Sequence, residues 1–182
     1  DEVQTGIART GRLLAVDHEN VKPDVLVLGK ALSGGMYPVS AVLANDEVMN
    51  VIKPGQHGST FGGNPLAAAI ATEALNIVLD EKLAENADKL GKLFREKMNE
   101  YIKDSTICTL VRGKGLLNAI LINDTEESET AWNICLRLRD NGLLAKPTHG
   151  NIIRFAPPLV MNEEQLLDCV RIITETLKEF EK

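Results

Sequence analysis

The sequence predicts an α/β protein in which part of a large α/β domain is followed by a small C-terminal α+β domain. Residues 1–75 alternate short β-rich runs with glycine and proline before a helical pattern begins. Helical periodicity continues through a connecting segment, residues 76–105. Residues 106–182 then alternate strand-like and helical patterns. We therefore expect two structural domains joined by a helical segment.

In the first part, Val25–Leu28 and Val39–Leu43 are strand candidates, because both are short apolar runs near turn residues. Asn64-Pro65 predicts a helix start, with asparagine as the N-cap and proline at the first helical position. Apolar residues follow at helical spacing as far as Val78. After a polar break, a second helix is expected over residues 83–102.

The small domain is expected to contain four strands and two helices. A helix around residues 128–141 should end at Asn141-Gly142, a C-terminal stop signal. A closing helix should begin at Asn162, with Gln165 as its capping-box partner. The strand candidates are four apolar runs: Cys108–Val111, Leu116–Ile122, Leu143–Lys146 and Asn151–Phe155.

Charge and composition exclude several classes of function. The net charge is -6 with both signs interspersed, which argues against binding to nucleic acid or to an anionic membrane. No stretch approaches the roughly 20 apolar residues of a membrane span. Cys108, Cys135 and Cys169 lie in apolar contexts and indicate the buried, reduced thiols of an intracellular protein. The histidines and cysteines show no metal-ligand spacing, so no metal site is predicted.

Lys30 is the strongest catalytic candidate. It follows the apolar run Val25–Leu28 and precedes the small residues of Ala31-Leu32-Ser33-Gly34-Gly35. We expect a strand to deliver a buried amine to a turn with room for a ring-shaped ligand. Burial favours the uncharged amine, which can attack a carbonyl group. The alternative is an ordinary surface lysine after a strand.

Two further segments carry polar groups that could bind a ligand. The first, Asp1-Glu2-Val3-Gln4-Thr5-Gly6, offers a carboxylate and an amide upstream of the lysine. The second, His57-Gly58-Ser59-Thr60-Phe61-Gly62-Gly63, places two hydroxyls between glycines, where hydroxyls and backbone amides can close on a phosphate. An exposed carboxylate and an ordinary glycine-rich turn are the alternatives.

These three segments together resemble the subgroup III, or omega-type, aminotransferases of fold type I, which use pyridoxal 5'-phosphate. The resemblance implies that Lys30 forms the Schiff base and moves the substrate proton, and that Asp1 pairs with the ring nitrogen. It also implies that Gln4 bonds the phenolic oxygen, and that Ser59 and Thr60 bind the phosphate. In the family, the residue matching Thr60 serves the neighbouring subunit, so a homodimer with shared active sites is expected.

Arg154 is an arginine inside an apolar strand, and a buried arginine needs a partner. It could form a structural ion pair. The family resemblance favours instead contact with a substrate carboxylate. Arg112 and Lys114, in contrast, are expected to stabilise the glycine-rich strand junction and not to touch substrate.

Residues 137–150, Arg-Leu-Arg-Asp-Asn-Gly-Leu-Leu-Ala-Lys-Pro-Thr-His-Gly, are similar to the ornithine aminotransferase branch of this family. The implied reaction moves the δ-amino group of L-ornithine to 2-oxoglutarate. Other omega-aminotransferases, of acetylornithine or 4-aminobutyrate type, remain alternatives, as does a non-catalytic fragment or dimerisation partner. The resemblance implies that this chain is the C-terminal half of a longer enzyme of the cytoplasm or mitochondrial matrix.

Overall fold

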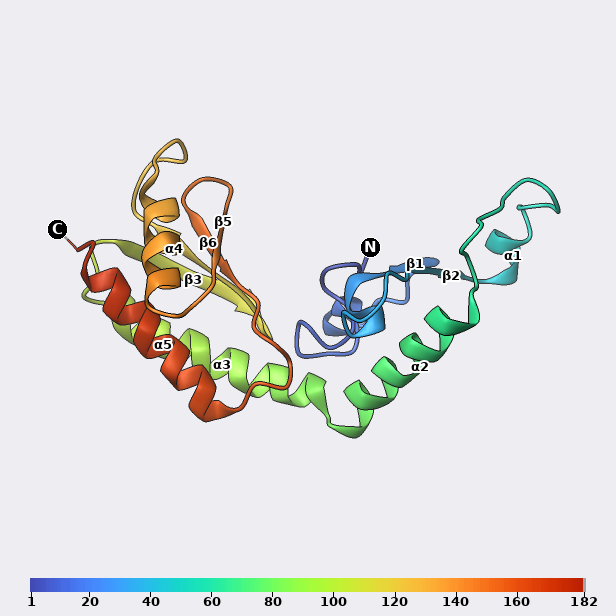
Figure 1. Cartoon of the computed structure of the whole chain (residues 1–182), viewed down its shortest axis with the longest axis horizontal. Helices are drawn as coiled ribbons and strands as arrows, with labels where there is room; N and C mark the ends of the chain where they lie inside the picture. The colour runs from blue at the N-terminus through green and yellow to red at the C-terminus, as the bar shows by residue number, and fades with distance from the viewer. Residues whose placement is uncertain (182) are drawn as a thin grey trace. The chain divides into compact units, whose positions relative to one another are not determined.

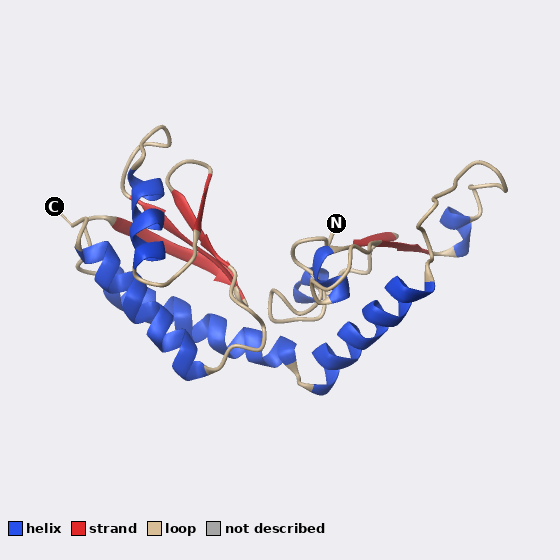
Figure 2. Cartoon of the chain, viewed as in Figure 1, coloured by secondary structure: helices blue, strands red, loops and turns tan. Residues whose placement is uncertain are grey.

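The computed structural model describes residues 1–181 and divides into two compact units, residues 1–84 and residues from 85 onward. We call them the N-terminal and the C-terminal unit. Both contain helices and strands, as Figures 1 and 2 show. The boundary between the units falls inside residues 76–105, the segment for which the sequence predicts a connecting helix. The predicted mixed α/β class is confirmed.

The N-terminal unit contains one antiparallel hairpin and two principal helices. Val25 of β1 lies opposite Ala44 of β2, and Leu28 lies opposite Ala41. The first strand has the predicted bounds, whereas the second starts two residues later than expected. The elements are the 3-10 helices η1 (Ala15–His18) and η2 (Lys30–Ser33), β1 (Val25–Leu28), β2 (Ala41–Ala44), α1 (Asp46–Met49) and α2 (Pro65–Asp80).

The start of α2 confirms the predicted capping pattern. Asn64 Oδ1 accepts a hydrogen bond from Ala67 N at 2.8 Å, and Pro65 is the first helical residue. The helix also contacts η2: a Cβ at Gly34 would lie 3.5 Å from Ala74 Cβ. Ala67 and Val78 are buried in this unit. The cap therefore sets where α2 begins, and its packing supports the turn that contains Lys30.

The C-terminal unit is a four-stranded antiparallel sheet packed against three helices. Its strand order is β3-β4-β6-β5. One face of the sheet carries Ile120 and Ile153 into a core that also contains Phe94, Leu138 and Ile173 from the helices. The elements are α3 (Leu83–Ile102), β3 (Cys108–Lys114), β4 (Leu117–Ile122), α4 (Thr130–Asp140), β5 (Lys146–Thr148), β6 (Ile152–Phe155) and α5 (Glu163–Lys178).

Two local features fix the helices of this unit. At the start of α5, Asn162 Oδ1 accepts from Gln165 N at 2.9 Å and Gln165 Oε1 accepts from Asn162 N at 3.0 Å, which is the predicted capping box. In α3, a Cβ at Gly91 would lie 1.8 Å from the carbonyl oxygen of Gly115. Only glycine lets α3 approach the β3–β4 turn so closely.

All three cysteines are free thiols. Burial raises the pKa of Cys108 and of Cys135 to about 11, so both remain protonated at neutral pH. Within residues 1–181, no helix is both long and apolar enough to cross a membrane.

Glu181 anchors the end of α5 to the junction between α3 and β3. Its carboxylate accepts hydrogen bonds from Tyr101 Oη at 2.6 Å, Ser105 Oγ at 2.7 Å, Thr106 N at 2.6 Å and Ile107 N at 3.1 Å. Partial burial acts to raise the pKa of Glu181, but the hydrogen bonds from Thr106, Tyr101 and Ser105 outweigh it and lower the pKa to about 2.

Replacing Glu181 by glutamine should destabilise the protein by about 1 kcal/mol at neutral pH, because an amide cannot accept all of these bonds and the site is only partly buried. Since the folded-state pKa is depressed, the carboxylate stabilises above its ordinary pKa of 4.5 and loses this effect as the pH falls toward 2. Urea unfolding from pH 7 to pH 2 measures the difference. Glu179→Gln, which breaks an exposed ion pair with Arg137 and weakens a hydrogen bond with Asn141, is the control and should change little.

Candidate active site

Lys30 lies in a strained backbone conformation at the end of β1. Its φ is +44°, in the left-handed region, although it has a long side chain. Such a conformation costs about 1–3 kcal/mol in a residue other than glycine and is concentrated at functional sites. Gly29 before it is extended, and Leu32 N donates to the Gly29 carbonyl at 3.0 Å to close the turn of η2. The chain thus turns sharply at Lys30 itself.

Ser33 is a buried side chain that links this turn to the next segment. It is 2% exposed. Its hydroxyl donates to the Lys30 carbonyl at 3.5 Å and accepts from Tyr37 N at 3.4 Å. Both bonds are long, but together they join the backbone at Lys30 to the backbone at Tyr37. Sequence reasoning treated Ser33 only as a small residue and missed this contact.

An open cavity of about 460 Å³ lies beside Lys30 and is lined by Lys30, Tyr37, Pro38, Val39 and Ser40. The lysine side chain is exposed. The expectation of a buried amine is therefore wrong for this chain. The reason is that β1 belongs to a two-stranded sheet, which cannot cover both faces of a strand, and Val25 at its start is exposed.

The segment that begins with Asp1 runs beside the end of β1. Glu2 N donates to the Val27 carbonyl at 2.9 Å, and a Cβ at Gly29 would lie 3.4 Å from a methyl group of Val3. This places Asp1 near the strand end that carries the lysine. Asp1 is exposed, and its Oδ1 accepts from Val3 N at 2.8 Å.

The residues after Asp1 turn tightly from Val3 to Thr10. Ile7 and Ala8 are both buried at positive φ. Gln4 lies in this turn and is exposed. The Gly6 N–H bonds the Glu2 carbonyl at 2.9 Å. The turn is closed by this local bond and by the Glu2 carboxylate, which accepts from Val16 N farther along the chain.

Glu2 has a structural role. Its side chain is buried and accepts hydrogen bonds from the Thr5 hydroxyl and from Val16 N, the latter at 2.9 Å. Burial acts to raise the pKa of Glu2, but these hydrogen bonds outweigh it and leave the pKa below its ordinary value. The ionised carboxylate therefore holds the loop that positions the first residues.

Ser59 and Thr60 lie in the loop between α1 and α2, apart from Lys30. Ser59 Oγ accepts from Gly62 N at 3.0 Å, and a Cβ at Gly62 would lie 2.9 Å from Ser59 Cβ. Neither hydroxyl residue lines the cavity beside Lys30. Figure 1 shows this loop projecting beyond the β1–β2 hairpin, and every residue from 45 to 63 is exposed.

Arg154 belongs to β6 in the C-terminal unit, whereas the other predicted site residues belong to the N-terminal unit. It is half-buried. Its register partners are Ala119 of β4 and Lys146 of β5. The prediction that Arg154 lies within an apolar strand is confirmed. Arg154 is on the face of the sheet opposite to the core.

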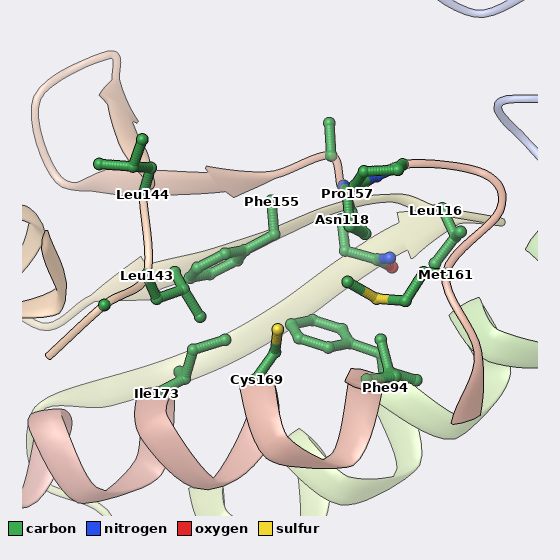
Figure 3. Close-up of a pocket in the computed structure, with 14 residues that line it drawn as sticks. Phe94, Leu116, Asn118, Leu143, Leu144, Phe155, Pro157, Met161, Cys169 and Ile173 are labelled. Carbon is green, nitrogen blue, oxygen red and sulfur yellow. The ribbon is translucent and has the colours of Figure 1, made fainter. Parts of the chain in front are cut away.

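A second cavity, of about 330 Å³, lies in the C-terminal unit and is mainly apolar (Figure 3). Phe94, Phe155 and Met161 line it, and Cys169 points into it from α5. Asn118 supplies a polar group to the lining. Its Oδ1 accepts a hydrogen bond from Arg95 Nη1 at 2.8 Å, and its Nδ2 donates to the Gly115 carbonyl at 3.0 Å. None of the predicted site residues lines this cavity, so it is not the candidate active site.

Residues 1–177 match the family described as Aminotransferase class-III. The chain belongs to the class-III aminotransferases. Solved structures that resemble it include an acetylornithine aminotransferase from Elizabethkingia anophelis (TM-score 0.96, 72% identity, 98% of this chain and 45% of that chain). Another is an ornithine aminotransferase from Plasmodium yoelii (TM-score 0.94, 58% identity, 100% of this chain and 47% of that chain).

Curated relatives of this class-III aminotransferase chain include two mitochondrial ornithine aminotransferases. The protein from Rattus norvegicus is 61% identical over 99% of this chain and 40% of its own length. The protein from Drosophila melanogaster is 63% identical over 97% of this chain and 40% of its own length. The chain thus spans less than half the length of these relatives. The predicted family and fold class are confirmed.

Proposed function

We propose that the protein containing this chain is a pyridoxal phosphate-dependent ornithine aminotransferase. It would transfer the δ-amino group of L-ornithine to 2-oxoglutarate, giving glutamate semialdehyde, which cyclises to pyrroline-5-carboxylate, and glutamate. The observation that carries the proposal is Lys30, an exposed amine on a strained turn beside an open cavity, in a class-III aminotransferase chain. The names of the relatives at 61% and 63% identity support the choice of substrate.

Lys30 lines the cavity, and Asp1 and Gln4 belong to the segment that runs beside the end of β1, so these three residues would hold the proposed cofactor. Pyridoxal phosphate, when bound, supplies a carbonyl for the amino group and a ring that accepts electrons from the substrate carbon. Lys30 Nζ is free to reach a carbonyl in the cavity, and as a free amine it would take the proton from the substrate carbon and return it. The Asp1 carboxylate would accept a hydrogen bond from a protonated ring nitrogen. Gln4 would donate its amide N–H to the phenolic oxygen.

Arg154 would bind a substrate carboxylate. A guanidinium presents two parallel N–H groups to a carboxylate, so it orients the substrate as well as attracting it. 2-Oxoglutarate carries two carboxylates and ornithine only one, so the arginine is expected to matter more for the 2-oxoglutarate half of the reaction.

Acetylornithine aminotransferase is the second candidate, because the structure from Elizabethkingia anophelis shares 72% identity with this chain. Turnover of ornithine, N-acetylornithine and 4-aminobutyrate by the full-length protein separates the candidates. The two ornithine compounds present the same terminal amine and differ at the α-nitrogen, which is charged only without the acetyl group. We expect ornithine to have the highest kcat/KM; a higher value for N-acetylornithine would favour the second candidate.

Ser59 and Thr60 are proposed to bind the cofactor phosphate of a second subunit. Two observations support a role in trans: neither residue lines the cavity beside Lys30, and every residue from 45 to 63 is exposed. The same segment exposes Val51 and Phe61, apolar side chains that a partner subunit would cover. A homodimer with shared active sites would satisfy both observations.

Replacing Thr60 by valine should weaken cofactor retention, because a phosphate oxygen loses one hydroxyl donor. Mixed dimers test the shared site. If Thr60 acts in trans, pairing Thr60→Val subunits with Lys30→Ala subunits leaves one intact site in each mixed dimer. Random assortment should then recover about a quarter of the wild-type activity.

Two controls make this experiment decisive. A doubly substituted subunit paired with a wild-type subunit leaves no intact site in the mixed dimer if Thr60 acts in trans. Thr72→Val removes an exposed hydroxyl that bonds the Ala68 carbonyl within α2, and it should retain cofactor normally. Absence of recovery when the two single variants are paired would contradict the shared site.

A further inference from the structure

The turn after Lys30 holds a backbone conformation that is unfavourable on its own. A φ of +44° costs free energy in a residue with a side chain, and it persists only where the surrounding structure fixes it. Lys30 is exposed, so the packing of its own side chain does not supply this constraint. Backbone bonds close the turn, such as the one from Leu32 N to the Gly29 carbonyl at 3.0 Å. A side chain from within the turn, that of Ser33, bonds the Lys30 carbonyl as well.

Ser33 links two residues that line the cavity beside Lys30. Its hydroxyl donates to the Lys30 carbonyl at 3.5 Å and accepts from Tyr37 N at 3.4 Å, and both of these residues line the cavity. Between Ser33 and Tyr37 lie Gly34 and Gly35, whose φ values are +61° and +84°. Glycine leaves the backbone free to adopt other conformations. The hydroxyl therefore restrains a segment that its own residues leave flexible.

The contribution of this hydroxyl to overall stability is small. Ser33 is 2% exposed, and burying a hydroxyl costs free energy that two long hydrogen bonds offset only in part. Alanine at this position would avoid that cost and fill nearly the same space. Tyr37 lies beside an open cavity, so water can accept a bond from its N–H when the hydroxyl is absent. We therefore expect the fold to tolerate alanine, and the backbone from Lys30 to Tyr37 to lose a restraint.

We propose that Ser33 is a positioning residue for Lys30. Its hydroxyl holds the Lys30 backbone in the left-handed region and keeps the Tyr37 backbone at a fixed distance from it. Ser33 does not line the cavity, so it acts on the lysine through the backbone. The inference rests on the proposed function in taking Lys30 as the amine that bonds the cofactor and moves the substrate proton.

Fixing the backbone matters because the lysine side chain is long and flexible. Its four methylene groups let the amine sample many positions, and a fixed backbone narrows that range. Displacing a reacting group by about 1 Å can lower a rate by about 100-fold. The two bonds of Ser33 are long, so we expect a smaller effect on the rate, about tenfold. Because Ser33 is outside the cavity lining, kcat should fall while KM stays near its wild-type value.

Ser33→Ala in the full-length protein tests the inference with two independent measurements. In the holoenzyme, kcat for ornithine should fall about tenfold with KM unchanged. Ser33→Cys should give an intermediate kcat, because a thiol is a weaker donor and acceptor than a hydroxyl. In the cofactor-free protein, hydrogen exchange at the Tyr37 amide should be about tenfold faster in Ser33→Ala than in the wild type. The free energy of unfolding should stay near the wild-type value.

Thr176→Val is the matched control, because it removes another buried hydroxyl, one that accepts from Asn141 Nδ2 at 2.9 Å in the C-terminal unit. It should lower the free energy of unfolding and leave kcat and the Tyr37 exchange rate unchanged. Wild-type kcat in Ser33→Ala, or a loss of stability there as large as in Thr176→Val, would overturn the inference. Absence of cofactor on Lys30 in the wild-type protein would contradict the proposed function instead, and the Tyr37 exchange rate would still decide whether Ser33 restrains the turn.

Discussion

Replacing Lys30 by alanine should lower the rate of amino transfer by several powers of ten and abolish covalent attachment of the cofactor. Alanine has no amine to bond the cofactor carbonyl and no group to move the substrate proton. The side chain is exposed, and the turn of η2 is held by backbone bonds, including Leu32 N to the Gly29 carbonyl at 3.0 Å. We therefore expect the variant to fold normally.

Borohydride reduction of the full-length protein, followed by peptide mass spectrometry, measures attachment directly. Wild-type protein should carry the reduced cofactor on Lys30, and the variant should carry none. Lys53→Ala is a suitable control, since Lys53 is exposed in the same unit and its Nζ bonds the Asn50 carbonyl at 2.6 Å. Cofactor trapped on a different lysine in the wild-type protein would remove the basis of the proposed function.

Replacing Asp1 by asparagine should lower the rate of each half-reaction by several powers of ten. An amide does not hold a proton on the ring nitrogen as a carboxylate does, so the ring becomes a weaker acceptor for the electrons of the substrate carbon. The local structure should persist, because the asparagine oxygen can still accept the bond from Val3 N that Asp1 Oδ1 accepts at 2.8 Å. The effect should therefore be electronic and not conformational.

Single-turnover kinetics with ornithine and with glutamate would measure the two half-reactions separately. Borohydride trapping on Lys30 should be retained, which distinguishes this variant from Lys30→Ala. Asp24→Asn removes an exposed carboxylate at the turn before β1 and should leave both rates near normal. Near-normal rates in Asp1→Asn would show that Asp1 does not pair with the ring nitrogen.

Features that depend on near neighbours in the chain were predictable. Asn64 and Asn162 cap their helices as expected, because a cap is a hydrogen bond across three residues. The bounds of β1 followed from a short apolar run between turn residues. Lys30 was identified for the same reason: its chemical type, the strand before it and the small residues after it are all local.

Features that depend on contacts between residues far apart in the chain were predicted less accurately. The burial of Lys30 was inferred from the apolar character of β1, but a strand is buried only when other elements cover it, and β1 has β2 as its only sheet neighbour in the described residues. The turn after Asp1 was missed because it is closed by Glu2, whose carboxylate bonds Val16 N fourteen residues away. No local pattern reports such a bond.

The sequence by itself determined the residue types of the candidate site, the family resemblance and most helix and strand positions, because these follow from local chemistry. Only the tertiary structure decided that Lys30 adopts a strained φ beside an open cavity and that Ser33 ties its turn to Tyr37. It also decided that Arg112, Arg154 and Lys146 lie on one register line of the C-terminal sheet. Strand register and burial depend on contacts between residues far apart in the chain. The free energy of those contacts depends on which elements pack together, and a local pattern does not contain that information.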